Sequence, residues 1–121
     1  MMRYILVVDD DRSTREFLRA WLESAGYLVK DAPDATGALD IMMDEPASVA
    51  LIDIQMPIHD GLWLAERLKA EWPDVPIVFA SAMDDIHTVE QARRLGAVDY
   101  VTKPFQWEML FQALRRASTA A

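Results

Sequence analysis

The chain has 121 residues, of which 52% are hydrophobic and 26% charged, with a formal net charge of −8 at pH 7. This length suits one domain with its own core, so we expect a single domain over residues 1–121. The chain has no cysteine, which excludes disulfides and thiolate metal sites. The acidic balance disfavours nucleic acid and is compatible with cation binding. No apolar run approaches the roughly 20 residues of a membrane span, so we expect a cytoplasmic protein.

The first two predicted elements are a strand and an amphipathic helix. The apolar run Tyr4–Val8 predicts a buried strand. Apolar residues with helical spacing follow it and end at a glycine suited to helix termination: Phe17, Leu18, Trp21, Leu22, Ala25 and Gly26. Ser13 and Glu16 fit a capping box at the start of this helix, although Asp11 competes with Ser13 as the capping residue.

Two further pairs of elements follow the first helix. Leu28–Lys30 predicts a second strand and Val49–Ile52 a third. Between them, Asp34 opens a helix and Pro46 closes it. Its apolar face comprises Ala35, Ala38, Leu39 and Met42. After the third strand, Pro73 stops a helix. Its apolar face comprises Leu64, Ala65, Leu68 and Trp72.

The remaining elements continue the same alternation. Pro76–Ala80 and Val98–Val101 predict the fourth and fifth strands. Gly96 ends the helix between them. The apolar face of that helix comprises Ile86, Val89 and Ala92. A final helix follows Pro104, and its apolar face comprises Leu110, Ala113, Leu114 and Ala117.

Near-continuous apolar strands in strict alternation with helices predict an α/β fold. The expected architecture is a doubly wound, five-stranded parallel sheet with helices on both faces. In such a sheet, ligands bind outside the carboxyl ends of the strands, near the point where the strand order reverses. No glycine-rich phosphate loop follows any strand, which disfavours Walker-type and dinucleotide-binding sites.

Polar side chains follow four of the predicted strands. Asp9 and Asp10 follow the first, and Asp53 follows the third. Ser81 follows the fourth strand and Lys103 the fifth. These strand ends share one edge of a parallel sheet, so we expect the side chains to converge there. Clustered carboxylates repel one another unless a cation lies among them, and hard oxygen ligands suit Mg²⁺.

This set of groups predicts phosphoryl transfer. An ionised carboxylate at the end of a buried strand is unfavourable unless a partner offsets its charge. Lys103 supplies a positive charge for an anion, and Ser81 supplies a hydroxyl donor. A metal, a lysine and a hydroxyl around Asp53 would position a phosphoryl group and neutralise its oxygens. We therefore expect Asp53 to be a nucleophile that forms an aspartyl-phosphate.

Four segments of the chain resemble the receiver domain of bacterial two-component response regulators. They are ILVVDDD, LIDIQMP followed by DG, VFASA, and GAVDYVTKPF, and they cover the chain in the family's order. The resemblance implies a flavodoxin-like (βα)5 fold with strand order 2-1-3-4-5. It implies that a sensor histidine kinase or phosphotransfer protein phosphorylates the chain, which then switches conformation to control an output domain or partner. It implies no enzyme activity beyond self-phosphorylation from small phosphodonors and autodephosphorylation.

The resemblance also implies roles for the acidic residues and their neighbour. Asp53 is the expected phosphoacceptor and also a ligand of Mg²⁺. Asp10 is expected to bind the ion directly, and Asp9 to reach it through water. Gln55 is expected to contribute its backbone carbonyl, for which the identity of its side chain does not matter.

The same resemblance implies a lysine and a pair of switch residues. Lys103 is expected to pair with the acceptor or its phosphoryl group, and its peptide bond to Pro104 is expected to be cis. Ser81 and Tyr100 occupy the switch positions. Phosphorylation is expected to draw Ser81 inward and to let Tyr100 turn from outside to inside. That movement would alter the face formed by the fourth helix, fifth strand and fifth helix.

An aromatic pair lies outside the apolar face of the last helix. Trp107 and Phe111 are four residues apart, so their rings are expected to be neighbours on one flank. We expect this flank to belong to the face named above and to serve a partner or a phosphorylation-dependent homodimer. The alternative is that Trp107 folds over the sheet edge and Phe111 is a lone exposed aromatic.

Three other functions are possible for such a sequence. An Mg²⁺-dependent phosphohydrolase with an aspartyl nucleophile needs a second acid two residues after it, where this chain has Gln55, and a substrate cap. A flavin-binding electron carrier needs a Ser/Thr-rich phosphate loop where this chain has three aspartates. An interaction module that is not phosphorylated is disfavoured because all the chemical residues are present.

Overall fold

The computed structural model describes residues 2–120, in which strands and helices alternate without exception. The strands are β1 (Ile5–Val8), β2 (Val29–Ala32), β3 (Val49–Asp53), β4 (Ile77–Ser81) and β5 (Asp99–Thr102). The helices are α1 (Arg12–Ser24), α2 (Ala35–Asp44), α3 (Gly61–Glu71), α4 (Ile86–Arg94) and α5 (Trp107–Ala120). Within these described residues, no helix is both long and apolar enough to cross a bilayer.

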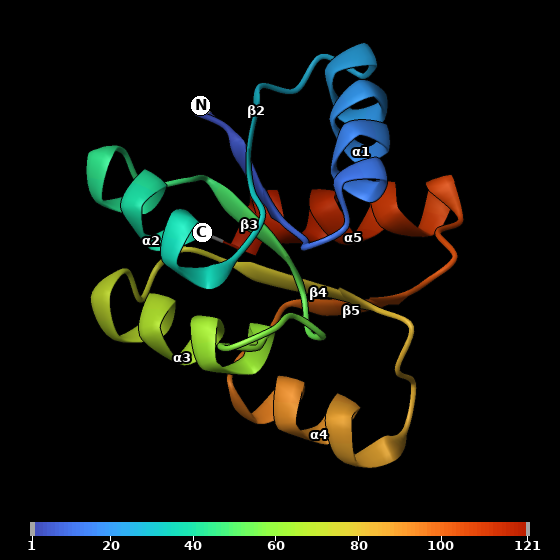
Figure 1. The fold of residues 1–121 in the computed structure, drawn as a ribbon. Coiled ribbons are helices and arrows are strands. Elements are labelled where there is room, and N and C mark those ends of the chain that lie inside the picture. Colours follow the sequence, from blue (N-terminus) through green and yellow to red (C-terminus); the bar gives the residue numbers. More distant parts are fainter. Residues whose placement is uncertain (1, 121) are drawn as a thin grey trace.

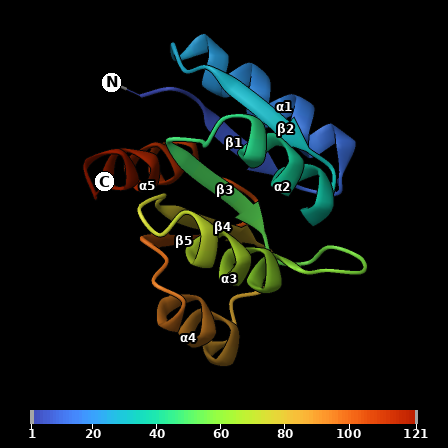
Figure 2. The same cartoon turned by 90° about the vertical axis from the view of Figure 1, so that its left-hand side faces the viewer.

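All strands belong to one parallel sheet with the order β2-β1-β3-β4-β5 (Figure 1). Helices α1 and α5 cover one face of the sheet, and α2, α3 and α4 cover the other (Figures 1 and 2). The predicted fold class and strand order are therefore confirmed. The strand order reverses between β1 and β3, where doubly wound sheets bind their ligands.

Successive strand residues point into two separate hydrophobic cores. Leu6 and Ile52 lie in the core beneath α2, α3 and α4. Val7 and Leu51 lie in the core beneath α1 and α5. Strands β1, β3 and β4 are buried at every position, because helices cover both faces of the sheet. Apart from the polar residues that end β3 and β4, their sequences are therefore apolar throughout.

Aspartate side chains cap the first four helices. The capping residues of α1 to α4 are Asp11, Asp34, Asp60 and Asp85, and each accepts a hydrogen bond from the amide three residues later. Of the two candidates for α1, the structure selects Asp11. Gly26 follows this helix with a φ of 95°. This left-handed backbone conformation is strained for a residue with a side chain but not for glycine.

Strand β2 differs from its predicted position. The apolar run predicted Leu28–Lys30, whereas the strand covers Val29–Ala32 and Leu28 is 68% exposed. This strand lies at the edge of the sheet, and its two central residues are polar and only partly buried. An edge strand is less enclosed than a central one, so an apolar run does not mark its ends.

The buried face of α4 also differs from the prediction. Ile86 and Val89 are 81% and 37% exposed, although helical spacing placed them on the apolar face with Ala92. Ala92 is buried as expected, and Thr88 is buried beside it. Thr88 can be buried because its hydroxyl donates to the capping residue Asp85, at 2.7 Å, and is thus satisfied. The buried face of α4 therefore includes a polar residue, which a search for regularly spaced apolar residues does not find.

Five aromatic rings join α1 to α5, and we call them the aromatic cluster: Phe17, Trp21, Tyr27, Trp107 and Phe111. Trp107 stacks on Phe111 with ring centroids 4.7 Å apart. Trp21 meets Trp107 edge to face at 4.7 Å, and Tyr27 meets Phe111 at 5.9 Å. Phe17 lies against Trp21 at 4.3 Å and stays 49% exposed, although the spacing had placed it with the buried residues of α1.

The aromatic cluster shows on which flank of α5 the two rings lie, which differs from the expected direction. Trp107 and Phe111 are neighbours, as predicted, but their flank of α5 packs against α1 and not toward α4. The predicted buried face of α5 is confirmed, because Leu110, Ala113, Leu114 and Ala117 are fully buried. Helical spacing gives the angle between this face and the aromatic pair. It does not specify which helix lies beside that pair.

The aromatic cluster should contribute to stability. Phe111→Ala should lower the free energy of unfolding by about 2 kcal/mol, because the ring loses its packing against Trp107 and Tyr27. Urea unfolding measures this change. Met109→Ala is the matched control on the same helix, since Met109 is 56% exposed, and its cost should stay below about 0.5 kcal/mol. Equal effects of the two substitutions would contradict the structural role of the ring.

Candidate functional site

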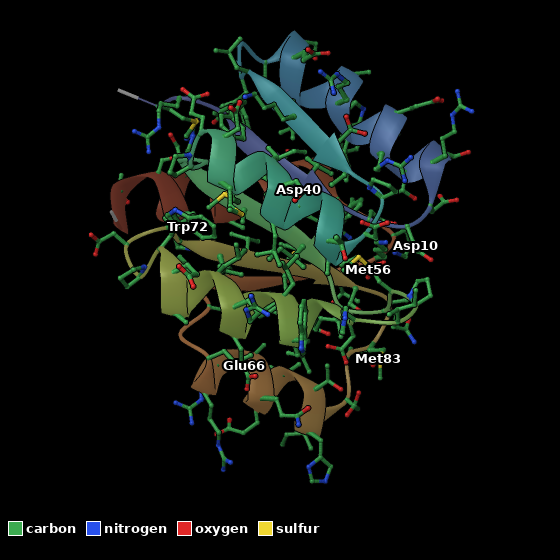
Figure 3. All side chains as sticks on the ribbon, turned by 60° about the vertical axis from the view of Figure 1, so that its left-hand side comes forward. Asp10, Asp40, Met56, Glu66, Trp72 and Met83 are labelled. Carbon is green, nitrogen blue, oxygen red and sulfur yellow. The ribbon has the colours of Figure 1, made fainter. Side chains whose placement is uncertain are left out.

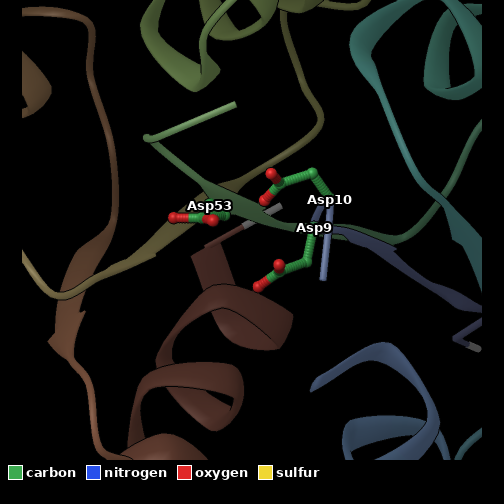
Figure 4. A group of neighbouring side chains, drawn as sticks. All are labelled: Asp9, Asp10 and Asp53. Atoms are coloured by element: carbon green, nitrogen blue, oxygen red, sulfur yellow. The ribbon is translucent and has the colours of Figure 1, made fainter. Parts of the chain in front are cut away.

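The parallel register brings the predicted acidic residues together. Val8 pairs with Ile52, so the residues that follow them in the chain, Asp9 and Asp53, reach the same edge of the sheet. The carboxylates of Asp9, Asp10 and Asp53 each offer an oxygen within 4.8 Å of the others (Figure 4). The three side chains therefore form one acidic cluster at the carboxyl ends of β1 and β3.

Burial makes the charge of Asp53 costly. Asp9 and Asp53 are 2% and 6% exposed, whereas Asp10 is exposed to solvent. Burial, together with the negative charge of Asp9, raises the pKa of Asp53 to about 6. The backbone amide of Gln55 opposes this shift by donating to Asp53 Oδ1 at 3.2 Å, and so does Lys103. Asp53 is therefore mainly ionised at neutral pH but holds a proton more tightly than an exposed aspartate.

Lys103 links the two buried carboxylates. Its Nζ donates to Asp9 Oδ2 at 2.6 Å and lies 3.4 Å from Asp53 Oδ2. Burial acts to lower the pKa of Lys103, but the hydrogen bond to Asp9 and the charge of Asp53 outweigh it, so the pKa is raised. The ammonium group thus stays charged, and it lies closer to Asp9 than to the expected acceptor. The peptide bond from Lys103 to Pro104 is cis.

The two expected switch residues meet at the loop that follows β4. Ser81 is fully buried, and its hydroxyl accepts a hydrogen bond from the amide of Met83 at 3.1 Å. The hydroxyl of Tyr100 donates to the carbonyl of Met83, and the half-buried ring lies 6.5 Å from that of Phe79. The structure therefore connects Ser81 and Tyr100 through a single residue. It also attaches the hydroxyl of Tyr100 to the loop after β4.

Ser81 also anchors the backbone of the lysine. The amide of Lys103 donates to the carbonyl of Ser81 at 2.8 Å, just beyond the pairing of Ser81 with Thr102. The loop that carries the ammonium group is thereby fixed to the end of β4. The side chains of Ser81 and Lys103, from two neighbouring strand ends, therefore keep their relative positions through a backbone contact.

Gly61 is a site residue that the sequence did not reveal. A Cβ atom at this position would lie 2.2 Å from the carbonyl oxygen of Asp53 and 2.8 Å from the Cα of Ile54. The amide of Gly61 donates to the carbonyl of Ile54 at 2.8 Å, so α3 begins directly against the end of β3. The pair Asp60–Gly61 in the sequence indicated only a turn. The close approach depends on where the loop returns, which no local pattern specifies.

A groove of about 550 Å³ lies beside the acidic cluster. Residues that line it include Asp10, Gln55, Met56, Met83, Thr88 and Gln91. In Figure 3, Asp10, Met56 and Met83 lie at the same end of the molecule, whereas Trp72 lies at the other end. A small group can therefore reach the exposed carboxylate of Asp10 from solvent.

The donor atoms of the cluster fit magnesium. Mg²⁺ prefers oxygen ligands and binds through one or two carboxylates while it keeps several waters. The cluster supplies carboxylate oxygens from Asp9, Asp10 and Asp53, and one of its members is open to water. Lys103 offsets only part of their negative charge. A divalent cation therefore suits both the ligand type and the remaining charge.

Comparison with known proteins places this site in a family. Residues 5–115 match the family model of the response regulator receiver domain. The chain is 39% identical over 111 residues to the response regulator MprA of Mycobacterium sp. (strain KMS), covering 92% of this chain and 48% of MprA. It is 37% identical over 113 residues to the C4-dicarboxylate transport transcriptional regulatory protein DctD of Rhizobium meliloti (strain 1021), covering 93% of this chain and 25% of DctD.

The structural comparison agrees with the sequence comparison. The receiver domain of NtrX from Brucella abortus superposes with a TM-score of 0.91 at 33% sequence identity, covering 97% of this chain and 99% of that one. The chain spans about half the length of MprA and a quarter of DctD. The family match, the sheet order and the position of the acidic cluster all lead to one assignment. The chain belongs to the response regulator receiver domains, the signalling domains of two-component systems.

Proposed function

We propose that the chain accepts a phosphoryl group on Asp53 with the help of Mg²⁺ and then changes conformation to control an output domain or a partner. One observation carries this proposal: the convergence of three carboxylates and the ammonium group of Lys103 at the carboxyl edge of the sheet. Membership of the receiver family supports it.

Magnesium would be held by the acidic cluster and the backbone carbonyl of Gln55. When bound, the ion would neutralise the phosphoryl oxygens and the surplus negative charge of the carboxylates. Asp9 and Lys103 already form an ion pair, with Asp9 Oδ2 and Nζ 2.6 Å apart. This pair fixes the direction of the Asp9 carboxylate before any other group arrives.

Asp53 would act as the nucleophile. An ionised Oδ attacks the phosphorus of the donor, a new O–P bond forms, and the bond from phosphorus to the leaving group of the donor breaks with its electron pair. The reaction needs the ionised carboxylate, which predominates at neutral pH because the pKa of Asp53 is about 6. Lys103 Nζ, 3.4 Å from Asp53 Oδ2, supplies positive charge for the transferred oxygens, and Ser81 supplies a hydroxyl.

The signal would leave the site through the loop after β4. Ser81 and Tyr100 both bond to Met83, so a shift of Ser81 toward a phosphoryl group would also move the contact of Tyr100. The proposed partners are a sensor histidine kinase or phosphotransfer protein in the cytoplasm and an output domain. Phosphorylation-dependent pairing through the face of α4, β5 and α5 also stays a proposal.

A phosphohydrolase finds no support in the comparisons. The exposed Gln55 occupies the position two residues after Asp53. The backbone N–H of Gln55 donates a hydrogen bond to the Asp53 carboxylate. Such an enzyme would need an acid there to protonate the leaving group.

Acetyl phosphate should label Asp53. Incubation of the chain with acetyl phosphate and Mg²⁺ should add one phosphoryl group, and intact-mass analysis should detect it. Asp53→Asn should abolish labelling because the amide is not a nucleophile, and removal of Mg²⁺ with a chelator should have the same effect. Asp84→Asn is the matched control, since it removes one exposed charge near the same edge and should leave labelling intact. Equal labelling of Asp53→Asn and the native chain would disprove the assignment.

Magnesium should stabilise the fold in a concentration-dependent way, because it binds the folded state preferentially. Thermal unfolding should show a melting temperature that rises with Mg²⁺. Asp10→Asn should remove most of this rise. Asp11→Asn should retain it, because Asp11 caps α1 and an asparagine can do the same. Both substitutions remove one negative charge, so a full response in Asp10→Asn would place the metal elsewhere.

The raised pKa of Asp53 predicts a pH dependence of stability in the metal-free chain. Its pKa is about 6 in the folded state, against a reference value of 3.8. The folded state thus binds the proton more tightly than the unfolded state. The resulting stabilisation is complete below the reference pKa and is lost as the pH rises through about 6.

Asp53→Asn removes this titration. The mutant should therefore gain stability relative to the native chain as the pH rises, and urea unfolding of both proteins at several pH values measures the difference. A difference that stays constant from about pH 4 to about pH 8 would show that the pKa of Asp53 is not raised.

A further inference from the structure

A largely buried arginine reaches from α1 back to the turn that carries the acidic cluster. Arg15 Nη1 donates to the backbone carbonyl of Asp9 at 2.8 Å, and Nε donates to Asp31 Oδ2 at 3.1 Å. The side chain of Arg15 is only 14% exposed. The guanidinium group therefore connects α1, the turn after β1 and the end of β2.

The carbonyl of Asp9 lies at a point where regular structure stops. The last paired residue of β1 is Val8, and the first backbone acceptor of α1 is the carbonyl of its capping residue, Asp11. Asp9 and Asp10 thus lie in the turn between strand and helix, and both belong to the acidic cluster. Arg15 fixes the peptide group that joins these two residues, and so it limits the directions that their side chains can take.

A second arginine provides an internal comparison. Arg19 lies one helical turn after Arg15, and its Nη1 donates to Asp31 Oδ1 at 2.5 Å. Its Nη2 donates to the carbonyl of Val29 at 3.0 Å. Both arginines therefore bind Asp31, but Arg15 holds the turn of the acidic cluster whereas Arg19 holds the start of β2.

We propose that Arg15 is a positioning residue for the magnesium site: its hydrogen bond to the Asp9 carbonyl presets the turn so that the carboxylates of Asp9 and Asp10 converge. This inference rests on the proposed function, because it concerns the same ion. Groups that orient metal ligands commonly change metal affinity by about tenfold or more when they are removed.

The charge of Arg15 acts in the opposite direction from its hydrogen bond. A guanidinium group near a cation site repels the cation, so removal of the charge alone should tighten the binding of Mg²⁺. Loss of orientation should weaken it. Arg15→Lys separates the two effects, because it keeps the charge but cannot reproduce the planar fork that reaches Asp9 and Asp31 together.

The experiment compares Arg15→Lys and Arg15→Met with the matched controls Arg19→Lys and Arg19→Met. Calorimetric titration with Mg²⁺, well below the melting temperature of each protein, should show a Kd raised about tenfold in both Arg15 variants. Both Arg19 variants should keep the native Kd, although they also lose a contact to the Asp31 carboxylate.

A second measurement needs no metal. The amide of Asp11 donates to Asp9 Oδ1 at 2.9 Å, so its hydrogen exchange reports the direction of that side chain. Exchange at Asp11 should be faster in the Arg15 variants than in the Arg19 variants. If the native chain failed to bind Mg²⁺, the proposed function would fail, while the exchange measurement would still test the positioning role.

Three outcomes would overturn the inference about Arg15. The first is a Kd equal to or lower than the native value in the Arg15 variants, which would mean that the arginine acts through charge or not at all. The second is equal weakening in the Arg15 and Arg19 variants, which would trace the effect to Asp31. The third is unchanged exchange at Asp11 in the Arg15 variants. If Arg15→Met fails to fold, Arg15→Lys still decides between these outcomes and the proposal.

Discussion

Repulsion among carboxylates at one sheet edge is the constraint on which the site depends. Two like charges about 4 Å apart repel by about 4 kcal/mol at an effective dielectric constant of 20. Asp9, Asp10 and Asp53 bring three such charges within 4.8 Å, against the single positive charge of Lys103. Burial is the main cause of the raised pKa of Asp53, and the surplus adds to this shift through the charge of Asp9, although an ammonium group lies 3.4 Å away. The surplus negative charge also favours the binding of a divalent cation or the neutralisation of one of the three carboxylates.

The fold offsets this cost with rigid surroundings. Strands β1 and β3 are buried at every position, and two cores hold them from both faces of the sheet. Gly61 allows α3 to begin against the backbone of Asp53, and Ser81 holds the backbone of Lys103. The aromatic cluster joins α1 to α5 on the opposite side from α4. The contacts of Tyr100 with the loop after β4 therefore lie on a side of the molecule that this packing does not cover.

Local and periodic features of the sequence determined most of the architecture. The alternation of apolar runs with helical patterns predicted every strand and helix, because burial on both faces makes parallel strands apolar throughout. Helix caps such as Asp34 are local, since the side chain bonds to an amide three residues away. The acidic cluster was predictable because parallel strands end at one edge, so that Asp9, Asp10 and Asp53 had to meet.

Contacts between distant segments decided the rest. The sequence shows that Trp107 and Phe111 share a flank, but only the packing of α5 beside α1 decides that this flank is covered. The glycine at 61 is necessary because a loop returns to the end of β3. Lys103 Nζ lies nearer to Asp9 than to Asp53, which no local pattern specifies. Periodicity and capping act within a few residues along the chain. The identity of a neighbour across the fold is a property of the tertiary structure alone.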